Sequence, residues 1–272
     1  MLRTRVVTAL VIFAIGLIGL FALPTTGFAI LAGAVLPLLG GWEAARLAGI
    51  DHPAGRWIFG IALALTAFLI YWAAPAPDWL LAAGCGLWLI NLAWLSVPAR
   101  GRSPKAPIIA FKLAVLALVL LVAWLALVQL QALSPWLVLL LFVIIAAADT
   151  GAYFSGRHFG GARLAPTISP GKTRAGALGG LAAAIILTPL AAQILPDIPF
   201  SALVAMLLAF LLALISIGGD LFISLLKRQR GLKDTSSLLP GHGGILDRFD
   251  SMSAVLPFFT LAVLYEAGLL IS

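Results

Sequence analysis

The sequence has few charged residues: Asp, Glu, Lys and Arg make up 10% of its 272 residues, whereas 62% are hydrophobic. Its mean hydropathy of +1.13 lies far outside the range of water-soluble domains, which excludes a soluble globular architecture. Cysteine and histidine are also scarce. The single Cys85 cannot form an intrachain disulfide, and three widely spaced histidines are too few for a conventional zinc site.

The sequence is instead rich in long apolar runs, each close to the ~20 residues that cross ~30 Å of hydrocarbon as a helix. Because the runs are continuous rather than alternating, they favour helices over a membrane β-barrel. We therefore predict an all-α polytopic integral membrane protein with about nine transmembrane helices. The predicted spans are Val6–Leu23, Phe28–Leu47, Trp57–Ala74, Trp79–Val97, Ile108–Leu133, Trp136–Ser155, Ala175–Leu195, Phe200–Leu226 and Met252–Ile271.

Two of these runs are ambiguous. Pro37 and the Gly40–Gly41 pair interrupt the second run, so it is the weakest of the nine. The first run follows basic residues and resembles a signal peptide. Because its apolar part is longer than a usual h-region, we predict a retained helix.

The placement of the basic residues tests this topology independently. With nine spans and a cytoplasmic N-terminus, all seventeen Lys and Arg lie in inside segments or, for Lys112, in the first turn of the fifth helix. The outside turns carry only Asp78 and Asp197. This asymmetry follows the positive-inside rule and predicts a C-terminus outside. The net charge of +7 therefore reflects topology and an anionic leaflet rather than nucleic-acid binding.

The chain divides into two unlike halves. Residues 1–107 have short loops and few polar groups, and we predict a membrane scaffold of about four helices. Residues 108–272 contain two long cytoplasmic loops, 156–174 and 227–250, and we predict a catalytic membrane domain of about five helices. Loops of this length in a compact protein are usually functional or disordered. Their mixture of Gly, Pro and His with single charges argues against disorder.

Acidic residues lie where lipid would exclude them. Asp149 and Asp220 each stand six residues before the end of a predicted span, ~9 Å inside its cytoplasmic end. A carboxylate in the middle of a spanning helix costs ~2.5–3.5 kcal/mol, so both side chains are expected to face a polar cavity. Ser216, Asp220, Ser224 and Lys227 follow one another at helical spacing and form a polar stripe.

Two further acids, Asp247 and Asp250, are three residues apart where the ninth helix begins. A single acid of this kind is explained equally well by a helix cap or an Arg partner. Four carboxylates in one pocket repel each other and need protons or cations. Carboxylates with access to water suit Mg²⁺, which often arrives with substrate phosphates. The four acids therefore indicate a divalent-metal site at the membrane surface.

Basic residues accompany the acids in both loops. Lys172, Lys227, Lys233 and Arg248 lie among Gly, Pro, Ser and Asp, where a charge that only sets topology is not needed. The backbone N–H groups of the PGHGG segment, 240–244, can also turn toward an anion. Together these groups suit a polyphosphate.

Three other features carry less weight. We interpret Arg163 and Arg230 as markers of topology, and His242 is equally well a loop residue or a substrate contact. The segment SPGKT, 169–173, ends like a P-loop. However, Pro166 occupies the position of the upstream glycine, and no strand is expected before it, so it is not a Walker A motif.

The segment Ser224–Asp250 reads SLLKRQRGLKDTSSLLPGHGGILDRFD. It closely resembles the signature of the phosphatidate cytidylyltransferases, also called CDP-diacylglycerol synthases: S-x-x-K-R, four residues, K-D, then P-x-H-G-G-x-x-D-R-x-D. The segment Asp149–Thr173, DTGAYFSGRHFGGARLAPTISPGKT, resembles the second block of this family. The sequence departs from the family after SPGKT, because Ala175 stands where the relatives carry an acid. For the N-terminal spans only size and hydrophobicity match.

The resemblance implies that phosphatidic acid and CTP react to give CDP-diacylglycerol and pyrophosphate at the cytoplasmic face of a bacterial inner membrane. The lipid phosphate would attack the α-phosphorus of CTP, with catalysis mainly by positioning and charge neutralisation. The cofactor would be Mg²⁺ or Mn²⁺. A further monovalent cation and a homodimer both stay open.

The resemblance also implies roles for the matched residues. Asp220 and Asp247 would bind the metal, supported by Asp149 and Asp250. The expected catalytic residues are Asp149, Lys172, Asp220, Asp247 and Asp250. The expected substrate-binding residues are Ser169, Thr173, Ser224, Lys227, Arg228, Lys233, His242, Gly243, Gly244 and Arg248.

Two rival functions share some of these features. Another membrane enzyme that uses CTP, such as a lipid kinase or a polyprenyl-phosphate transferase, would share the metal and nucleotide chemistry. A transporter would use Asp149 and Asp220 as coupling residues. Transporters often have related halves and binding sites at the midplane, whereas this chain has unlike halves and acids near one surface.

Overall fold

The computed structural model describes residues 2–73, 78–101 and 105–270, with side chains from Val6 onward. The predicted ends of the third and ninth spans, Ala74 and Ile271, lie outside the described residues, as does Arg102.

Helices dominate the described chain. In order they are α1 (Leu2–Ala22), α2 (Thr25–Gly33), the π-helical segment η1 (Ala34–Gly40), α3 (Gly41–Ala48), α4 (Pro53–Ala73), α5 (Asp78–Trp94), α6 (Ala106–Leu133), α7 (Pro135–Phe159), α8 (Arg174–Ile194), α9 (Ala202–Gln229) and α10 (Leu246–Glu266). Two short strands, β1 (Arg163–Ala165) and β2 (Ser169–Thr173), lie between α7 and α8.

The prediction of an all-α membrane protein is confirmed in its main point. Within the described residues, six helical stretches are long and apolar enough to cross a membrane. These are Thr25–Ala48, Pro53–Ala73, Ala106–Leu133, Pro135–Phe159, Arg174–Ile194 and Ala202–Gln229. Val6–Ala22 and Asp78–Trp94 are shorter apolar helices. The helix boundaries follow the predicted runs, but nine crossings and their direction stay a prediction.

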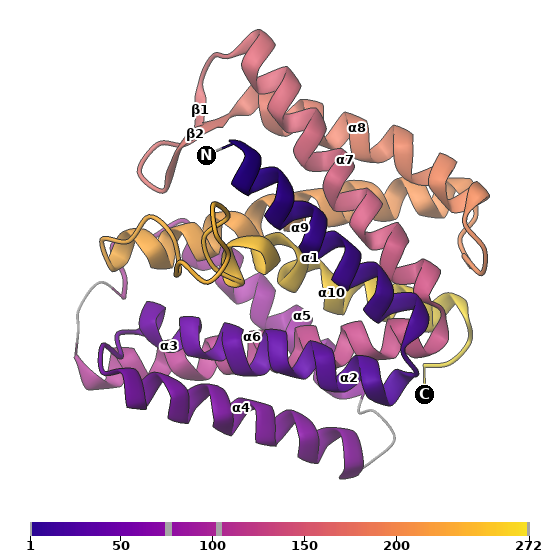
Figure 1. The fold of residues 1–272 in the computed structure, drawn as a ribbon. Coiled ribbons are helices and arrows are strands. Elements are labelled where there is room, and N and C mark those ends of the chain that lie inside the picture. The colour runs from indigo at the N-terminus through magenta and orange to yellow at the C-terminus, as the bar shows by residue number, and fades with distance from the viewer. Residues whose placement is uncertain (1, 74–77, 102–104, 271–272) are drawn as a thin grey trace.

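The helices are arranged in layers (Figure 1). At the top of the view α7 and α8 lie together, above α9 and α10. The lower layers contain α2, α3 and α4 from residues 1–107, together with α6, which lies almost wholly in residues 108–272. The helices α7 to α10 therefore pack onto a base that is made by the helices before them.

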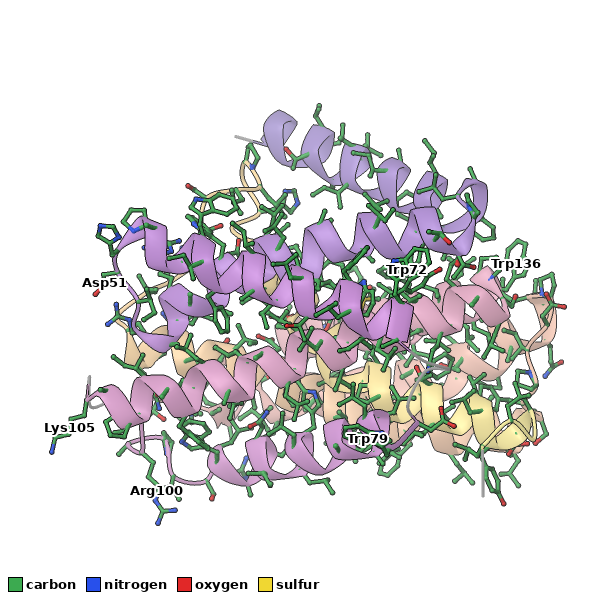
Figure 2. All side chains as sticks on the ribbon, turned by 90° about the horizontal axis from the view of Figure 1, so that it is seen from below. Asp51, Trp72, Trp79, Arg100, Lys105 and Trp136 are labelled. Atoms are coloured by element: carbon green, nitrogen blue, oxygen red, sulfur yellow. The ribbon has the colours of Figure 1, made fainter. Side chains whose placement is uncertain are left out.

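Several charged residues gather at one end of the bundle. Figure 2 shows Asp51, Arg100 and Lys105 at one end, with Trp72 and Trp136 toward the other. Tryptophan prefers the membrane–water interface, and Lys and Arg are enriched in cytoplasmic loops. The arrangement agrees with the alternation of sides that the charges predict.

The second span continues through its interruption instead of breaking. Pro37 lies inside the π-helical segment η1, whose wider turn accommodates a residue that has no N–H group. Gly41 follows and lies against α4, where an added Cβ would be 3.0 Å from the Cα of Gly60. The absence of side chains at Gly41 and Gly60 therefore permits a close crossing of α3 and α4.

The segment 156–174 is only partly a loop, contrary to the prediction. The helix α7 continues to Phe159, and β1 and β2 then form an antiparallel hairpin in which Arg163 pairs with Thr173 and Ala165 with Ser169. This hairpin is an exception to the all-α prediction. The side chain of Ile168 at its turn is buried against Leu221 and Leu225 of α9, which holds the hairpin on the helices.

Small residues let the helices of the second half approach closely. An added Cβ at Gly151 of α7 would lie 2.6 Å from the carbonyl oxygen of Gly179 in α8. An added Cβ at Gly219 of α9 would lie 2.7 Å from the carbonyl oxygen of Asp250 in α10. This second approach places Asp220, the next residue of α9, beside the start of α10.

Candidate active site

A cavity of about 780 Å³ opens between α7, β2, α8, α9 and α10. All four predicted acids line it: Asp149, Asp220, Asp247 and Asp250. The predicted bases Lys172, Lys227 and Arg248 line it too, together with Thr173. Segments that are far apart in the chain thus contribute charges of both signs to one chamber.

Asp220 lies at the centre of the polar stripe on α9. It forms an ion pair with Lys172 from β2, and Ser224 donates a hydrogen bond from Oγ to its Oδ1, at 3.2 Å. Ser216 and Lys227 of the same stripe also line the cavity. The polar stripe that the sequence predicts on this helix therefore forms part of the cavity wall.

Asp247 is held by four donors. Its Oδ1 accepts a hydrogen bond from Lys227 Nζ at 2.6 Å. Its Oδ2 accepts from the backbone N–H of Thr235 at 2.8 Å, from the Thr235 hydroxyl at 2.9 Å and from the backbone N–H of Gly244 at 2.9 Å. Burial alone would raise the pKa of the Asp247 carboxyl, but the hydrogen bonds from Lys227, Gly244 and Thr235 outweigh it and hold the pKa below its ordinary value.

Asp250 has a different environment. It precedes the predicted span Met252–Ile271 and stands beside Asp220, because Gly219 lets the two helices meet. Burial, and after it the charge of Asp220, raises the pKa of the Asp250 carboxyl to about 7. Two neighbouring carboxylates of this kind are stabilised by a cation between them.

The acids of the cavity offer a divalent ion two carboxylates rather than a complete set of protein ligands. Among residues 2–73, 78–101 and 105–270, no three Asp, Glu, His or Cys side chains gather at the spacing of metal ligands. Mg²⁺ is often bound by one or two carboxylates plus substrate phosphates, and Asp220 with Asp250 meets that requirement. Asp247 has fewer free lone pairs, because four protein donors already occupy it.

Several predicted substrate-binding groups already make hydrogen bonds to other parts of the protein. Arg228 donates to the carbonyl oxygens of Ile168 and Leu232, both at 3.2 Å, and so fastens the hairpin to the end of α9. The N–H of Gly244 donates to Asp247 and is not turned toward the cavity. The hydroxyl of Thr173 accepts from the N–H of Gly176 and caps α8.

Three other predicted contacts lie in a second hollow of about 540 Å³. Lys233, His242 and Gly243 line this hollow and do not line the first cavity. Asp234 and Arg248 line both, so the two hollows adjoin. Ser169 lies on β2 and lines neither of the two.

Some residues that form the site were not predicted. Arg157 and Arg163 line the cavity beside Tyr153, although the sequence pattern marks Arg163 only as a topology residue. The hydroxyl of Tyr153 accepts a hydrogen bond from Arg157 at 2.9 Å. Asp234 matches the signature, but no role was predicted for it.

Glu43 is the largest omission. It lies in α3, in the half that was expected to be only scaffold, and its side chain is completely buried. It accepts four hydrogen bonds from the segment 235–246. The sequence does indicate this residue, because Glu43 lies inside a predicted span and placing an acid in lipid costs free energy. The argument that singles out Asp149 and Asp220 holds equally for Glu43.

The sequence is similar to known proteins along almost its whole length. The sequence pattern of the Cytidylyltransferase family matches residues 3–265. The phosphatidate cytidylyltransferase of Pseudomonas aeruginosa is 41% identical over 276 residues, covering 98% of each chain. That of Haemophilus influenzae is 36% identical over 96% of this chain and 98% of its own, and that of Bacillus subtilis is 43% identical over 44% of this chain and 45% of its own. The chain belongs to the cytidylyltransferase family.

Proposed function

We propose that this protein transfers the cytidylyl group of CTP to phosphatidic acid, giving CDP-diacylglycerol and pyrophosphate. The observation that carries the proposal is the shared chamber in which Asp149, Asp220, Asp247 and Asp250 face Lys172, Lys227 and Arg248. The full-length similarity to two phosphatidate cytidylyltransferases identifies the substrates. A triphosphate and a lipid phosphate are both anions that such bases can hold.

The reaction is a displacement at phosphorus. An oxygen of the lipid phosphate forms a bond to the α-phosphorus of CTP, and the bond to the oxygen that bridges the α- and β-phosphates breaks. Pyrophosphate leaves with that oxygen. Because the attacking phosphate is already an anion, no strong general base is needed. The protein contributes by holding the reactants in line and by offsetting their charge.

The residues divide this work. Lys172 and Arg248 line the cavity with charges that suit the phosphates, and Lys172 is paired with Asp220 until a substrate binds. Lys227 is more deeply buried and is held by Asp247. Asp220 and Asp250 are the pair that would hold a divalent ion. When bound, Mg²⁺ or Mn²⁺ supplies charge neutralisation on the phosphates. The adjoining hollow at Lys233 and His242 gives an extended triphosphate room beyond the cavity.

The membrane arrangement is part of the proposal. Nine crossings with a cytoplasmic N-terminus would place the cavity at the cytoplasmic face of a bacterial inner membrane, where CTP is available. The charge asymmetry of the loops supports this direction. The protein could also form a homodimer, and light scattering of the solubilised protein would measure its molar mass.

Labelled CTP tests the proposed reaction. With phosphatidic acid present, label in the cytidine or the α-phosphate is expected to enter the lipid fraction, and label in the γ-phosphate is expected in pyrophosphate. A CTP-dependent lipid kinase would give the reverse, with γ-label in the lipid. A polyprenyl-phosphate transferase would leave phosphatidic acid unlabelled and react with a polyprenyl phosphate instead.

Replacing Lys105 with Gln is expected to change the rate by less than about twofold, the scale of an exposed charge far from the site. Lys105 is exposed just before α6, and its side chain makes no capping hydrogen bond. Initial rates at saturating CTP measure the effect. A large loss would mean that the site extends to the loop between α5 and α6.

A further inference from the structure

Glu43 lies behind the cavity wall and lines neither hollow. Its carboxylate accepts hydrogen bonds from the hydroxyls of Thr235 (2.9 Å) and Ser236 (2.6 Å). It also accepts from the backbone N–H groups of Ile245 (2.9 Å) and Leu246 (2.8 Å). Both ends of the segment 235–246 are thus attached to one carboxylate that is about 200 residues away in the chain.

The two backbone donors are the first N–H groups of α10. Ile245 caps this helix without a side-chain hydrogen bond of its own. Helix N-termini carry unsatisfied donors and partial positive charge, which an anion stabilises. Glu43 therefore acts as the cap of α10, supplied from α3.

Thr235 connects Glu43 to the site. Its hydroxyl has a single proton, which is shared between two carboxylates: the hydroxyl oxygen lies 2.9 Å from Glu43 Oε2 and 2.9 Å from Asp247 Oδ2. Its backbone N–H donates to Asp247, and its carbonyl accepts from Arg46 Nη1 at 2.9 Å. The position of Thr235, set by α3, thus sets the carboxylate of Asp247.

The atoms around Glu43 are closely packed. A Cβ added at Gly244 would collide with the Thr235 hydroxyl and with Glu43 Oε1. The close approach explains why this position in the PGHGG segment carries no side chain. The next residues in the chain lead directly to Asp247 and Arg248, which face the cavity.

We propose that Glu43 is a positioning residue for the reaction. It holds both ends of the segment 235–246, and through Thr235 and the start of α10 it fixes how Asp247 and Arg248 face the substrates. Burying a carboxylate costs free energy of folding unless hydrogen-bond donors satisfy it. Here all four donors belong to the segment 235–246. The inference rests on the proposed function for its kinetic part only.

Glu43→Gln is the test, since it keeps the shape but replaces one accepting oxygen with an NH₂ group that faces the same donors. Glu266→Gln is the matched control, because Glu266 is the only other glutamate of the sequence and is exposed at the end of α10. We expect kcat to fall about 100-fold in Glu43→Gln, the loss that ~1 Å of misplacement produces. The KM for phosphatidic acid is expected to rise by a smaller factor than kcat falls, because Arg248 is displaced but Lys172 and the α7–α8 wall are untouched. Glu43→Asp, which keeps the charge, is expected to recover part of kcat.

A second readout does not depend on activity. Lys233 and Arg230 lie just before the segment 235–246, and trypsin needs a locally unfolded chain around the bond it cuts, so cleavage after both residues is expected to accelerate in Glu43→Gln and to match the wild type in Glu266→Gln. A wild-type protein that transfers no cytidylyl group would refute the proposed function, while this proteolysis result would still decide whether Glu43 holds the loop.

Two results would overturn the inference. One is a Glu43→Gln protein with a lower melting temperature but wild-type kcat, which would assign Glu43 to stability alone. The other is wild-type proteolysis together with wild-type kcat. If Glu43→Gln does not fold, Ser236→Ala takes its place, since it removes one of the four donors and leaves the charge. A several-fold lower kcat with faster cleavage supports the inference there, and wild-type values refute it.

Discussion

Replacing Asp247 with Asn is expected to reduce cytidylyl transfer by about 100- to 1000-fold, the loss found when one electrostatic contact of an active site is removed. Oδ1 of Asp247 accepts from Lys227, and Oδ2 accepts from three donors. An amide has only one accepting oxygen. In the Asp247→Asn variant the new NH₂ group would face either Lys227 or the three donors, so the loop and the charge of Lys227 would both be misplaced.

Turnover measured at saturating CTP and phosphatidic acid checks this expectation, together with gel filtration to show that the variant is folded. Asp78→Asn is the matched control, because Asp78 begins α5 at the predicted outer side. The control should retain full activity. Full activity in Asp247→Asn as well would contradict the role given to this carboxylate.

Removing divalent cations is expected to stop the reaction completely, and Mg²⁺ or Mn²⁺ should restore it. Asp220 and Asp250 stand side by side, and the charge of Asp220 contributes to the raised pKa of Asp250. Adding the phosphates of both substrates brings further negative charge into the cavity. The five bases that line the cavity are already matched by five acids that line it, so the added phosphates need a divalent ion.

The measurement is the initial rate after treatment with a chelator, followed by titration with each metal. The same chelator already saturated with Mg²⁺ is the control for effects on the membrane or detergent. Transfer that continues after exhaustive chelation would refute the metal proposal but not the assignment of substrates.

The sequence predicted the helical stretches well because lipid imposes a simple requirement on them. A segment that crosses hydrocarbon needs about 20 apolar residues, and such runs can be read without knowledge of the packing. The same physics located Asp149 and Asp220, since an acid inside such a run needs a polar surrounding. Their equal predicted depth in the membrane indicated a shared site, and both line one cavity together with Asp247.

Other features depend on contacts that a linear reading does not reveal. The hairpin of β1 and β2 is held by Ile168 against α9, a partner more than fifty residues away. The position of Arg228 in the signature says nothing about the direction of its side chain, which donates to the carbonyl oxygen of Ile168; its predicted contact with phosphate stays a prediction. Glu43 was missed because its four donors lie about 200 residues away in the chain.

The wide turn of η1 has a consequence for the direction in which α3 presents its side chains. A helix advances by about 100° for each residue, and η1 changes this count just before Glu43. Insertion or deletion of one residue between Ala34 and Gly40 would rotate the rest of α3 by roughly a quarter turn. Glu43 would then point away from the start of α10 and lose its four donors, so the rotation of a scaffold helix about its own axis governs whether the cavity is correctly assembled.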